Sequence, residues 1–248
     1  MEKIKLFCLS YAGGSAMVYN SWKKTLDDLI ELHPVEIPGR GTRYSEPLCD
    51  TMEEIVDNVL RSVIKELNGS DYAFFGHSMG TIIIYELIHR IRCLGYKEPL
   101  HTFFSGRFPP HFNEKNPLHK LQDEEFKSEI FKLGGTPKEF IDNQELFDIF
   151  MPILRADYTA IETYKYTRRA KWDFNISVLY GTQDIEVQQY DYSEWESYVN
   201  GECNFYEFAG DHFFIHSNED QIVKIINCVL LESYIEKGSD KSICIMLE

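Results

Sequence analysis

The segment from Tyr72 to Leu94 constrains this chain more than any other, because a strand pattern, a serine turn and a helix pattern follow one another without a break. Tyr72–Phe75 is a short apolar run typical of a buried strand, and Thr81–Leu94 carries apolar residues at helical spacing. Between them, Gly76-His77-Ser78-Met79-Gly80 fits the pattern G-x-S-x-G. We expect glycine at both ends because a side chain there would strike neighbouring backbone in so tight a turn.

Strand, sharp turn and helix in this order present a serine hydroxyl as a nucleophile. We therefore interpret Ser78 as a candidate nucleophile, with the start of the following helix offering backbone N–H groups and a positive dipole end. The alternative is a glycine-bracketed turn with an idle serine. The pattern occurs by chance in chains of this length, but the flanking strand and helix patterns make the nucleophile the better interpretation.

Strand and helix patterns also alternate on both sides of this segment. Besides the elements above, we expect strands over 3–10, 34–37, 100–105, 176–180 and 204–208, and helices over 21–32, 51–67, 193–199 and 219–234. Such alternation predicts an α/β fold with a mostly parallel central sheet and helices on both faces. Thr51 should cap its helix, with Glu54 at the capping-box position. Beyond Glu236 we expect a loosely held tail.

The alternation stops over about 107–169, where helical patterns at 123–133, 137–143 and 145–164 predict a helical insertion. Its place just past the nucleophile segment favours a lid over the active site. Apolar residues at roughly helical spacing could cover an acyl pocket, or could simply pack as core: Phe126, Ile130, Phe131, Leu133, Phe147, Phe150, Met151 and Leu154. No linker or repeat is evident, so we predict a single domain over 1–248.

Charge and cysteine usage exclude several functions. A formal net charge of −15 argues against a nucleic-acid partner and disfavours an anionic membrane surface. No apolar run approaches the length of a membrane span. The six cysteines form no C-x-x-C pair and no cluster with histidine, and the N-terminus is not signal-like. We therefore expect a reducing cytoplasm, no metal and no cofactor.

A serine nucleophile requires a base and a group that orients the base. His212 lies in a loop after the last expected strand, where it can project over the carboxyl edge of the sheet, and Asp184 follows the preceding strand. Asp211 is the rival acid, but a sequence neighbour can rarely reach the ring of His212. His77, beside the nucleophile, should point away from the reaction. The order Ser78, Asp184, His212 is that of α/β-hydrolases.

The oxyanion of such a reaction requires two N–H donors. One should be the amide of Met79, directly after the nucleophile. The other should come from the loop after the first strand, where Ala12-Gly13-Gly14 allows the backbone to approach closely. The alternative for that loop is a plain glycine turn.

Several segments resemble type II thioesterases, the stand-alone editing enzymes of nonribosomal peptide and polyketide synthesis. Almost the whole chain is covered by segments similar to the family's F-P-x-A-G-G-S-A, P-G-R-G-x-R-x-x-E-P, G-H-S-M-G, L-R-A-D and G-D-H-F motifs: Leu9–Ala16, Pro38–Pro47, Gly76–Gly80, Leu154–Asp157 and Gly210–Phe213. One departure is Ser10, where the family usually has proline.

The resemblance implies hydrolysis of acyl thioesters on the phosphopantetheine arm of acyl or peptidyl carrier proteins. By that resemblance, Ser78 would attack the thioester, His212 would act as base, and the amides of Met79 and Ala12 would hold the oxyanion. Three other functions remain open: an acyltransferase to an alcohol or amine, a general small-molecule (thio)esterase, and a non-catalytic binder of carrier proteins.

Overall fold

The computed structural model describes residues 3–112, 117–132, 144–185 and 189–245. Its centre is a sheet of six strands in the order β2-β1-β3-β4-β5-β6, and every neighbouring pair is parallel. The strands are β1 Ile4–Leu9, β2 Ile30–Pro34, β3 Tyr72–His77, β4 His101–Ser105, β5 Ile176–Gly181 and β6 Cys203–Phe208. The predicted α/β class and parallel sheet are confirmed.

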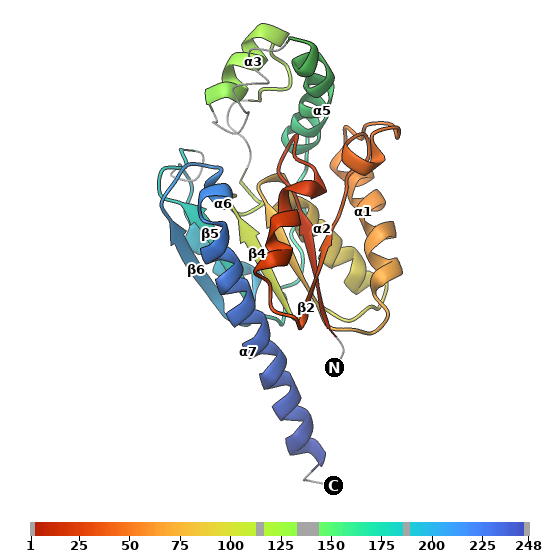
Figure 1. The fold of residues 1–248 in the computed structure, drawn as a ribbon, viewed down its shortest axis with the longest axis vertical. Coiled ribbons are helices and arrows are strands. Elements are labelled where there is room, and N and C mark those ends of the chain that lie inside the picture. Colours follow the sequence, from red (N-terminus) through yellow and green to blue (C-terminus); the bar gives the residue numbers. More distant parts are fainter. Residues whose placement is uncertain (1–2, 113–116, 133–143, 186–188, 246–248) are drawn as a thin grey trace.

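Helices cover both faces of this sheet (Figure 1). The helices of the structure are α1 Met52–Glu66, α2 Met79–Cys93, α3 Asp123–Lys132, α5 Gln144–Glu162, α6 Phe214–Ser217 and α7 Glu219–Ile245, with 3₁₀ helices η1 Ala16–Lys24, η2 Gly41–Arg43 and η4 Tyr192–Tyr198. Alternate residues of a strand point to opposite faces. Accordingly, Phe7 and Leu9 pack with α1 and α2, whereas Leu6 and Cys8 pack with η1 and α7.

The region between β1 and α1 differs from the expected pattern. In place of a helix over 21–32, the chain forms η1 and then turns at Asp27, whose carboxylate accepts the amide of Leu29 at 2.9 Å. The local hydrogen bond ends the helical path, and Ile30 then pairs with Ile4 in the sheet. Strand β2 therefore begins before the predicted 34–37 strand and overlaps it only at Pro34.

Other boundaries agree more closely. Helix α1 begins after Thr51, whose hydroxyl accepts the amide of Glu54 at 3.3 Å, so the predicted cap is confirmed. The segment near 193–199 is helical but of 3₁₀ type. The predicted loose tail beyond Glu236 is wrong, because α7 continues to Ile245 and projects past the body of the molecule (Figure 1). Lys237 on this extension pairs with Asp71, in the loop before β3.

The insertion over 107–169 contains α3 and α5, and its described part contains no strand. The two helices pack on each other through a small core of their own: Phe126, Ile130, Phe147, Met151 and Leu154. These side chains therefore pack within the insertion and not onto the sheet, and their role over an acyl pocket stays a prediction. Segment 137–143 and the side chains of Phe131 and Leu133 lie outside the described residues. Over the described ranges, no helix is both long and apolar enough to cross a bilayer.

Candidate active site

Ser78 sits in a strained turn between β3 and α2. Its backbone angles are φ 54° and ψ −114°, and no other described residue except glycine has a positive φ. A Cβ at Gly76 would lie 2.6 Å from the backbone of Gly80, and a Cβ at Gly80 would collide with the carbonyl oxygen of Leu9. The steric reason for both glycines is confirmed, and the strain is of the kind that functional sites retain.

The sheet holds this turn in place. The amide of Ser78 donates to the carbonyl of Ser105, at the end of β4, at 2.8 Å. The amide and hydroxyl of Thr81 both donate to the carbonyl of Ser78, at 3.0 and 2.8 Å. The backbone of Ser78 is therefore fixed from two sides, while its side chain caps no helix amide.

His212 and Asp184 come together at the same edge of the sheet. Nδ1 of His212 donates to the Asp184 carboxylate at 2.7 Å, and the two side chains are 9% and 0% exposed. The loops that carry them are hydrogen-bonded, with Gln183 N donating to Gly210 O at 2.9 Å. With Nδ1 engaged, Nε2 is the nitrogen left for proton transfer. The rival carboxylate of Asp211 instead accepts the amide of Phe213 at 2.9 Å.

His77 has a role that the sequence did not reveal. Its Nε2 lies 2.9 Å from the carbonyl oxygen of His212, and its Nδ1 lies 2.9 Å from the hydroxyl of Ser105. Burial lowers the pKa of His77 well below its usual value, so the ring is neutral at neutral pH. A carbonyl accepts only, so Nε2 carries the proton. His77 thus links the nucleophile turn to the backbone of the histidine loop.

Two backbone amides are available as oxyanion donors. In the loop after β1, the amide of Gly13 donates to Asp157 at 2.7 Å and that of Gly14 to Tyr11 O at 2.9 Å. Among the described residues, the amides of Ala12 and Met79 have no hydrogen-bond acceptor. Met79 is the first residue of α2, where helix amides are unpaired and the dipole is positive.

A family model described as a thioesterase domain matches residues 4–230. This chain belongs to the thioesterase family. The family model confirms the sequence-based assignment to enzymes that act on thioesters, and the structural comparisons below confirm the resemblance to type II thioesterases.

Individual relatives agree over nearly the full length. The crystal structure of ClbQ from the colibactin NRPS/PKS pathway matches with a TM-score of 0.89 and 38% identity, covering 94% of this chain and 99% of ClbQ. The type II thioesterase BorB from the borrelidin biosynthetic cluster matches with a TM-score of 0.82 and 30% identity, covering 92% and 93%.

One curated relative carries a different name. Linear gramicidin dehydrogenase LgrE of Brevibacillus parabrevis is 34% identical over 237 residues, which are 94% of this chain and 89% of that protein. The dehydrogenase name belongs to that protein. The present sequence contains no G-x-G-x-x-G fingerprint of dinucleotide-binding enzymes.

Tyr11 connects the loop after β1, which carries Ala12 and is called the donor loop below, to the segment that follows His212. Its hydroxyl lies 3.1 Å from Nε2 of His216, and its ring meets those of His77 and Phe213 edge to face, with centroids 5.8 and 5.0 Å away. Burial raises the pKa of Tyr11 to about 12, which keeps the phenol neutral. Tyr11 precedes the donor residue directly, so these contacts help to fix the start of the donor loop.

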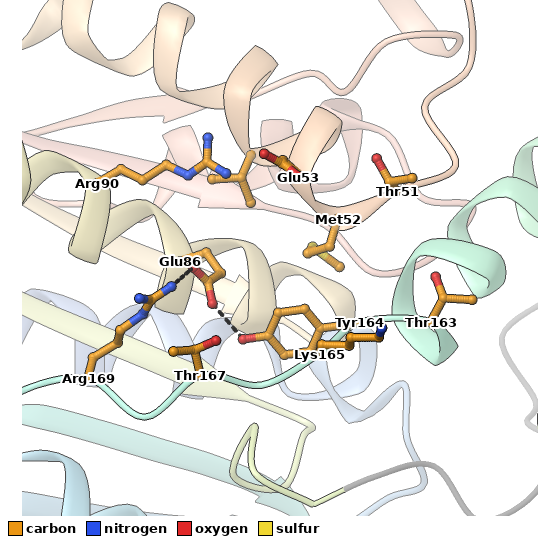
Figure 2. A pocket seen from close by; sticks show the side chains of 11 residues that line it. Thr51, Met52, Glu53, Glu86, Arg90, Thr163, Tyr164, Lys165, Thr167 and Arg169 are labelled. Carbon is orange, nitrogen blue, oxygen red and sulfur yellow. Dashed lines mark hydrogen bonds and ion pairs between the residues drawn. The ribbon is translucent and has the colours of Figure 1, made fainter.

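A separate cavity of about 420 Å³ lies between α1, α2 and the segment after α5, and none of Ser78, Asp184 and His212 lines it (Figure 2). The Glu86 carboxylate there accepts the Tyr164 hydroxyl at 2.7 Å and pairs with Arg169 at 3.3 Å. Arg90, one turn further along α2, pairs with Asp57 on α1. The charged groups of this cavity therefore hold α2 to its neighbours.

Proposed function

We propose that this thioesterase uses Ser78, His212 and Asp184 to release acyl groups from the phosphopantetheine arm of acyl or peptidyl carrier proteins. The observation that carries the proposal is the His212–Asp184 hydrogen bond of 2.7 Å at the sheet edge where the strained Ser78 turn ends. Names of relatives support the substrate class, since ClbQ comes from an NRPS/PKS pathway and BorB is a type II thioesterase of a biosynthetic cluster.

The reaction follows from the residues that the edge of the sheet brings together. Nε2 of His212 takes the proton of the Ser78 hydroxyl as the serine oxygen bonds to the thioester carbonyl carbon. The negative charge that forms on the carbonyl oxygen is met by the amides of Met79 and Ala12. The C–S bond then breaks, and the imidazolium gives its proton to the leaving pantetheine thiol.

Water completes the cycle. His212 removes a proton from a water molecule as that water attacks the acyl-serine ester. The second tetrahedral intermediate collapses, Ser78 recovers the proton from His212, and the acid leaves. Asp184 holds the imidazole in the tautomer with Nδ1–H and stabilises the imidazolium in both halves of the cycle.

Mass spectrometry of an acylated carrier protein tests this function. Wild-type enzyme should convert the acyl-carrier to the free phosphopantetheine form and release the acid, whereas Ser78→Ala should leave the carrier acylated. The same experiment with added alcohol or amine separates hydrolysis from acyl transfer, because a transferase would give the ester or amide. An unchanged carrier in the wild-type reaction, with small thioesters still cleaved, would contradict the carrier assignment.

We also propose that the enzyme works in the reducing cytoplasm. Five cysteines whose side chains the structure describes are free thiols: Cys8, Cys49, Cys93, Cys203 and Cys228. Fractionation of the producing cells, followed by immunodetection of the chain, tests this location.

A further inference from the structure

Two sequence motifs without a role so far meet in the interior. Arg40 belongs to the P-G-R-G segment and Asp157 to the L-R-A-D segment of α5, 117 positions away. Their side chains form a bidentate pair, with Nη1–Oδ2 at 2.5 Å and Nη2–Oδ1 at 2.6 Å. The side chains are 3% and 0% exposed.

The same carboxylate holds the donor loop. Oδ2 of Asp157 accepts the amide of Gly13 at 2.7 Å, and Nη1 of Arg40 lies 3.5 Å from the carbonyl oxygen of Gly14. Gly13 is the residue after Ala12, whose amide we assign to the oxyanion. The Arg40–Asp157 pair therefore fixes the peptide between Ala12 and Gly13, which adjoins the peptide that contains the amide of Ala12.

Helix α5 also packs directly on this loop. Gly13 has φ +76°, and a Cβ there would lie 2.7 Å from Cδ2 of Leu154 and 2.9 Å from Cζ of Phe150. Both side chains belong to the insertion helix that carries Asp157. The donor loop is therefore packed tightly between the side chains of α5 on one side and Arg40 on the other.

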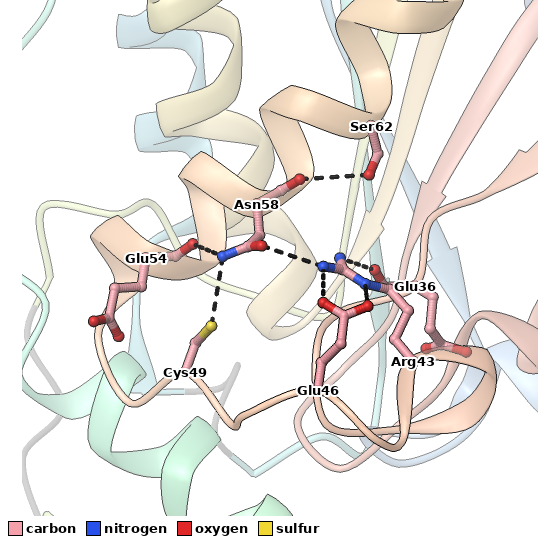
Figure 3. Close-up of polar contacts among 7 residues, drawn as sticks. All are labelled: Glu36, Arg43, Glu46, Cys49, Glu54, Asn58 and Ser62. Atoms are coloured by element: carbon pink, nitrogen blue, oxygen red, sulfur yellow. Dashed lines mark hydrogen bonds and ion pairs between the residues drawn. The ribbon is translucent and has the colours of Figure 1, made fainter.

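Arg40 lies in the turn of residues 36–46, and Figure 3 shows the contacts that Arg43 makes from this turn. Nε and Nη2 of Arg43 bind the Glu46 carboxylate at 2.7 and 2.5 Å, and Nη1 binds the Glu36 carbonyl at 3.2 Å. Arg43 also reaches Asn58 on α1 at 3.2 Å. These contacts of Arg43 hold the 36–46 turn against α1, so the backbone that carries Arg40 is fixed in position.

We propose that Arg40 and Asp157 are positioning residues for the oxyanion hole, and that the hole is complete only when α5 is seated on the donor loop. Buried ion pairs contribute little net stability, because desolvation offsets their attraction. The Arg40–Asp157 pair affects geometry more than stability, because holding the N–H of Gly13 restricts rotation of the neighbouring peptide that contains the amide of Ala12. The inference rests on the proposed function only in assuming that Ser78 forms a tetrahedral oxyanion.

The test compares two ligands of the folded enzyme. An acyl trifluoromethyl ketone adds to Ser78 and places an oxyanion in the hole, whereas an acyl thioether of the same length occupies the ground-state site without an oxyanion. For Asp157→Asn we expect kcat on a small acyl thioester and affinity for the ketone to fall together by roughly 10²-fold, the cost of misplacing a group by about 1 Å. KM and thioether affinity should change little.

Arg40→Lys is the milder second variant, because it keeps the charge but loses the bidentate geometry. We expect it to change the ratio of ketone to thioether affinity in the same direction but by less. If Asp157→Asn does not fold, the ratio of ketone to thioether affinity in Arg40→Lys decides whether the inference holds. Use of a small thioester keeps the test independent of carrier recognition.

Glu162→Gln is the matched control. Glu162 is also a buried carboxylate on α5, but it accepts the amides of Leu118 and His119 at 2.6 and 2.8 Å, within the insertion itself. Its loss should lower the melting temperature and leave the affinity ratio at the wild-type value. A shift of the ratio in this control, an unchanged ratio in both Asp157→Asn and Arg40→Lys, or equal loss of both affinities would overturn the inference.

Discussion

The two backbone amides that we propose as oxyanion donors, those of Met79 and Ala12, are held by different physical means. The amide of Met79 is fixed by its own surroundings: the sheet hydrogen bond of Ser78, the close glycine contacts and the start of α2. The amide of Ala12 lies in a loop held by Tyr11, by the buried Arg40–Asp157 pair and by α5. We call the amide of Met79 the scaffold donor, because the sheet and the start of α2 fix it. We call the amide of Ala12 the assembled donor, because its loop is held by three separate segments: the loop after β6, the 36–46 turn and α5.

This difference bears on how the enzyme can be controlled. A scaffold donor is present whenever the sheet is folded, whereas an assembled donor depends on the insertion being in place. A substrate that seats α5 would therefore also complete the hole, which couples binding to catalysis. The following predictions begin with the chemistry that both donors serve and then separate them.

The largest effect is expected from Ser78→Ala, which removes the proposed nucleophile, whose reaction both proposed donors would assist. Loss of a serine nucleophile costs about 10⁶-fold in kcat in a related triad enzyme. A fluorophosphonate probe should label the wild-type chain and leave the variant unlabelled. Equal labelling of both proteins would show that another residue is the nucleophile.

Asp184→Asn should come next, with a loss of about 10⁴-fold in turnover, because the amide favours the wrong tautomer of His212. The fold should be preserved, since the replacement has the same shape. Asp211→Asn is the neighbouring control and should do much less, because its carboxylate serves the amide of Phe213. Steady-state kinetics of both variants decide the assignment, and the reverse ranking would transfer the role to Asp211.

Two glycine substitutions, Gly80→Ala and Gly13→Ala, test the surroundings of the scaffold donor and of the assembled donor separately. A Cβ in Gly80→Ala would meet the carbonyl of Leu9, which belongs to the sheet and cannot move aside. We expect melting temperature and activity to fall together. In Gly13→Ala the new Cβ would meet the side chains of Leu154 and Phe150, which can move with α5, so activity should fall more than stability.

Leu154→Ala added to Gly13→Ala sharpens this comparison. Shortening Leu154 makes room for the new methyl group, although the positive φ of Gly13 still costs about 1–2 kcal/mol in any other residue. The double variant should therefore regain part of the lost kcat. If it is no more active than Gly13→Ala, contact with α5 does not control the loop.

The scaffold features were accessible from sequence because they are local. The strand, the turn and the helix around Ser78 follow one another directly, and Asp184 and His212 each follow a recognisable strand. The Arg40–Asp157 pair joins positions 117 apart and leaves no periodic signal, so the motifs could be noticed but not connected. The link from His77 to the His212 carbonyl depends likewise on how two loops approach.

The incorrect local predictions have the same kind of cause. Apolar spacing over 21–32 resembled that of a helix. In the structure, the Asp27 side chain accepts a hydrogen bond within a turn, and the residues from Ile30 onward form strand β2. The tail beyond Glu236 looked too polar to be ordered, yet α7 continues through it and Lys237 pairs with Asp71. In each case a contact with a distant segment or a single side-chain hydrogen bond outweighed the local pattern.

Acid should weaken the scaffold. Burial lowers the pKa of His101 to about 3 and that of His77 well below its usual value. The unfolded chain therefore binds more protons than the native one once the pH drops below about 6.5, so stability is full above that pH and decreases as the pH falls.

Urea unfolding at pH 7.5 and pH 5.0 measures the scaffold effect. The wild-type midpoint should be lower at pH 5.0, and His101→Gln, which cannot titrate, should show a smaller difference. His101 lies on β4 and its Nε2 is 2.8 Å from the Ser177 hydroxyl, a hydrogen bond that glutamine can replace. An equal pH difference in both proteins would mean that His101 does not contribute.

The smallest effect concerns salt and the carrier protein. With a net charge of −15, the enzyme should attract an acidic carrier weakly or repel it, so recognition should depend on apolar contacts near the insertion and on the pantetheine arm. We expect an acyl-carrier to have a higher kcat/KM than the same acyl group on a small thiol, and this advantage should survive added salt because screening leaves apolar burial intact. Lys165 and Arg168 are two exposed cationic side chains on the segment after α5. If the advantage collapses at high ionic strength, these two side chains form the first docking patch to test, and Arg168→Ala should then reduce the low-salt advantage without changing hydrolysis of the small thioester.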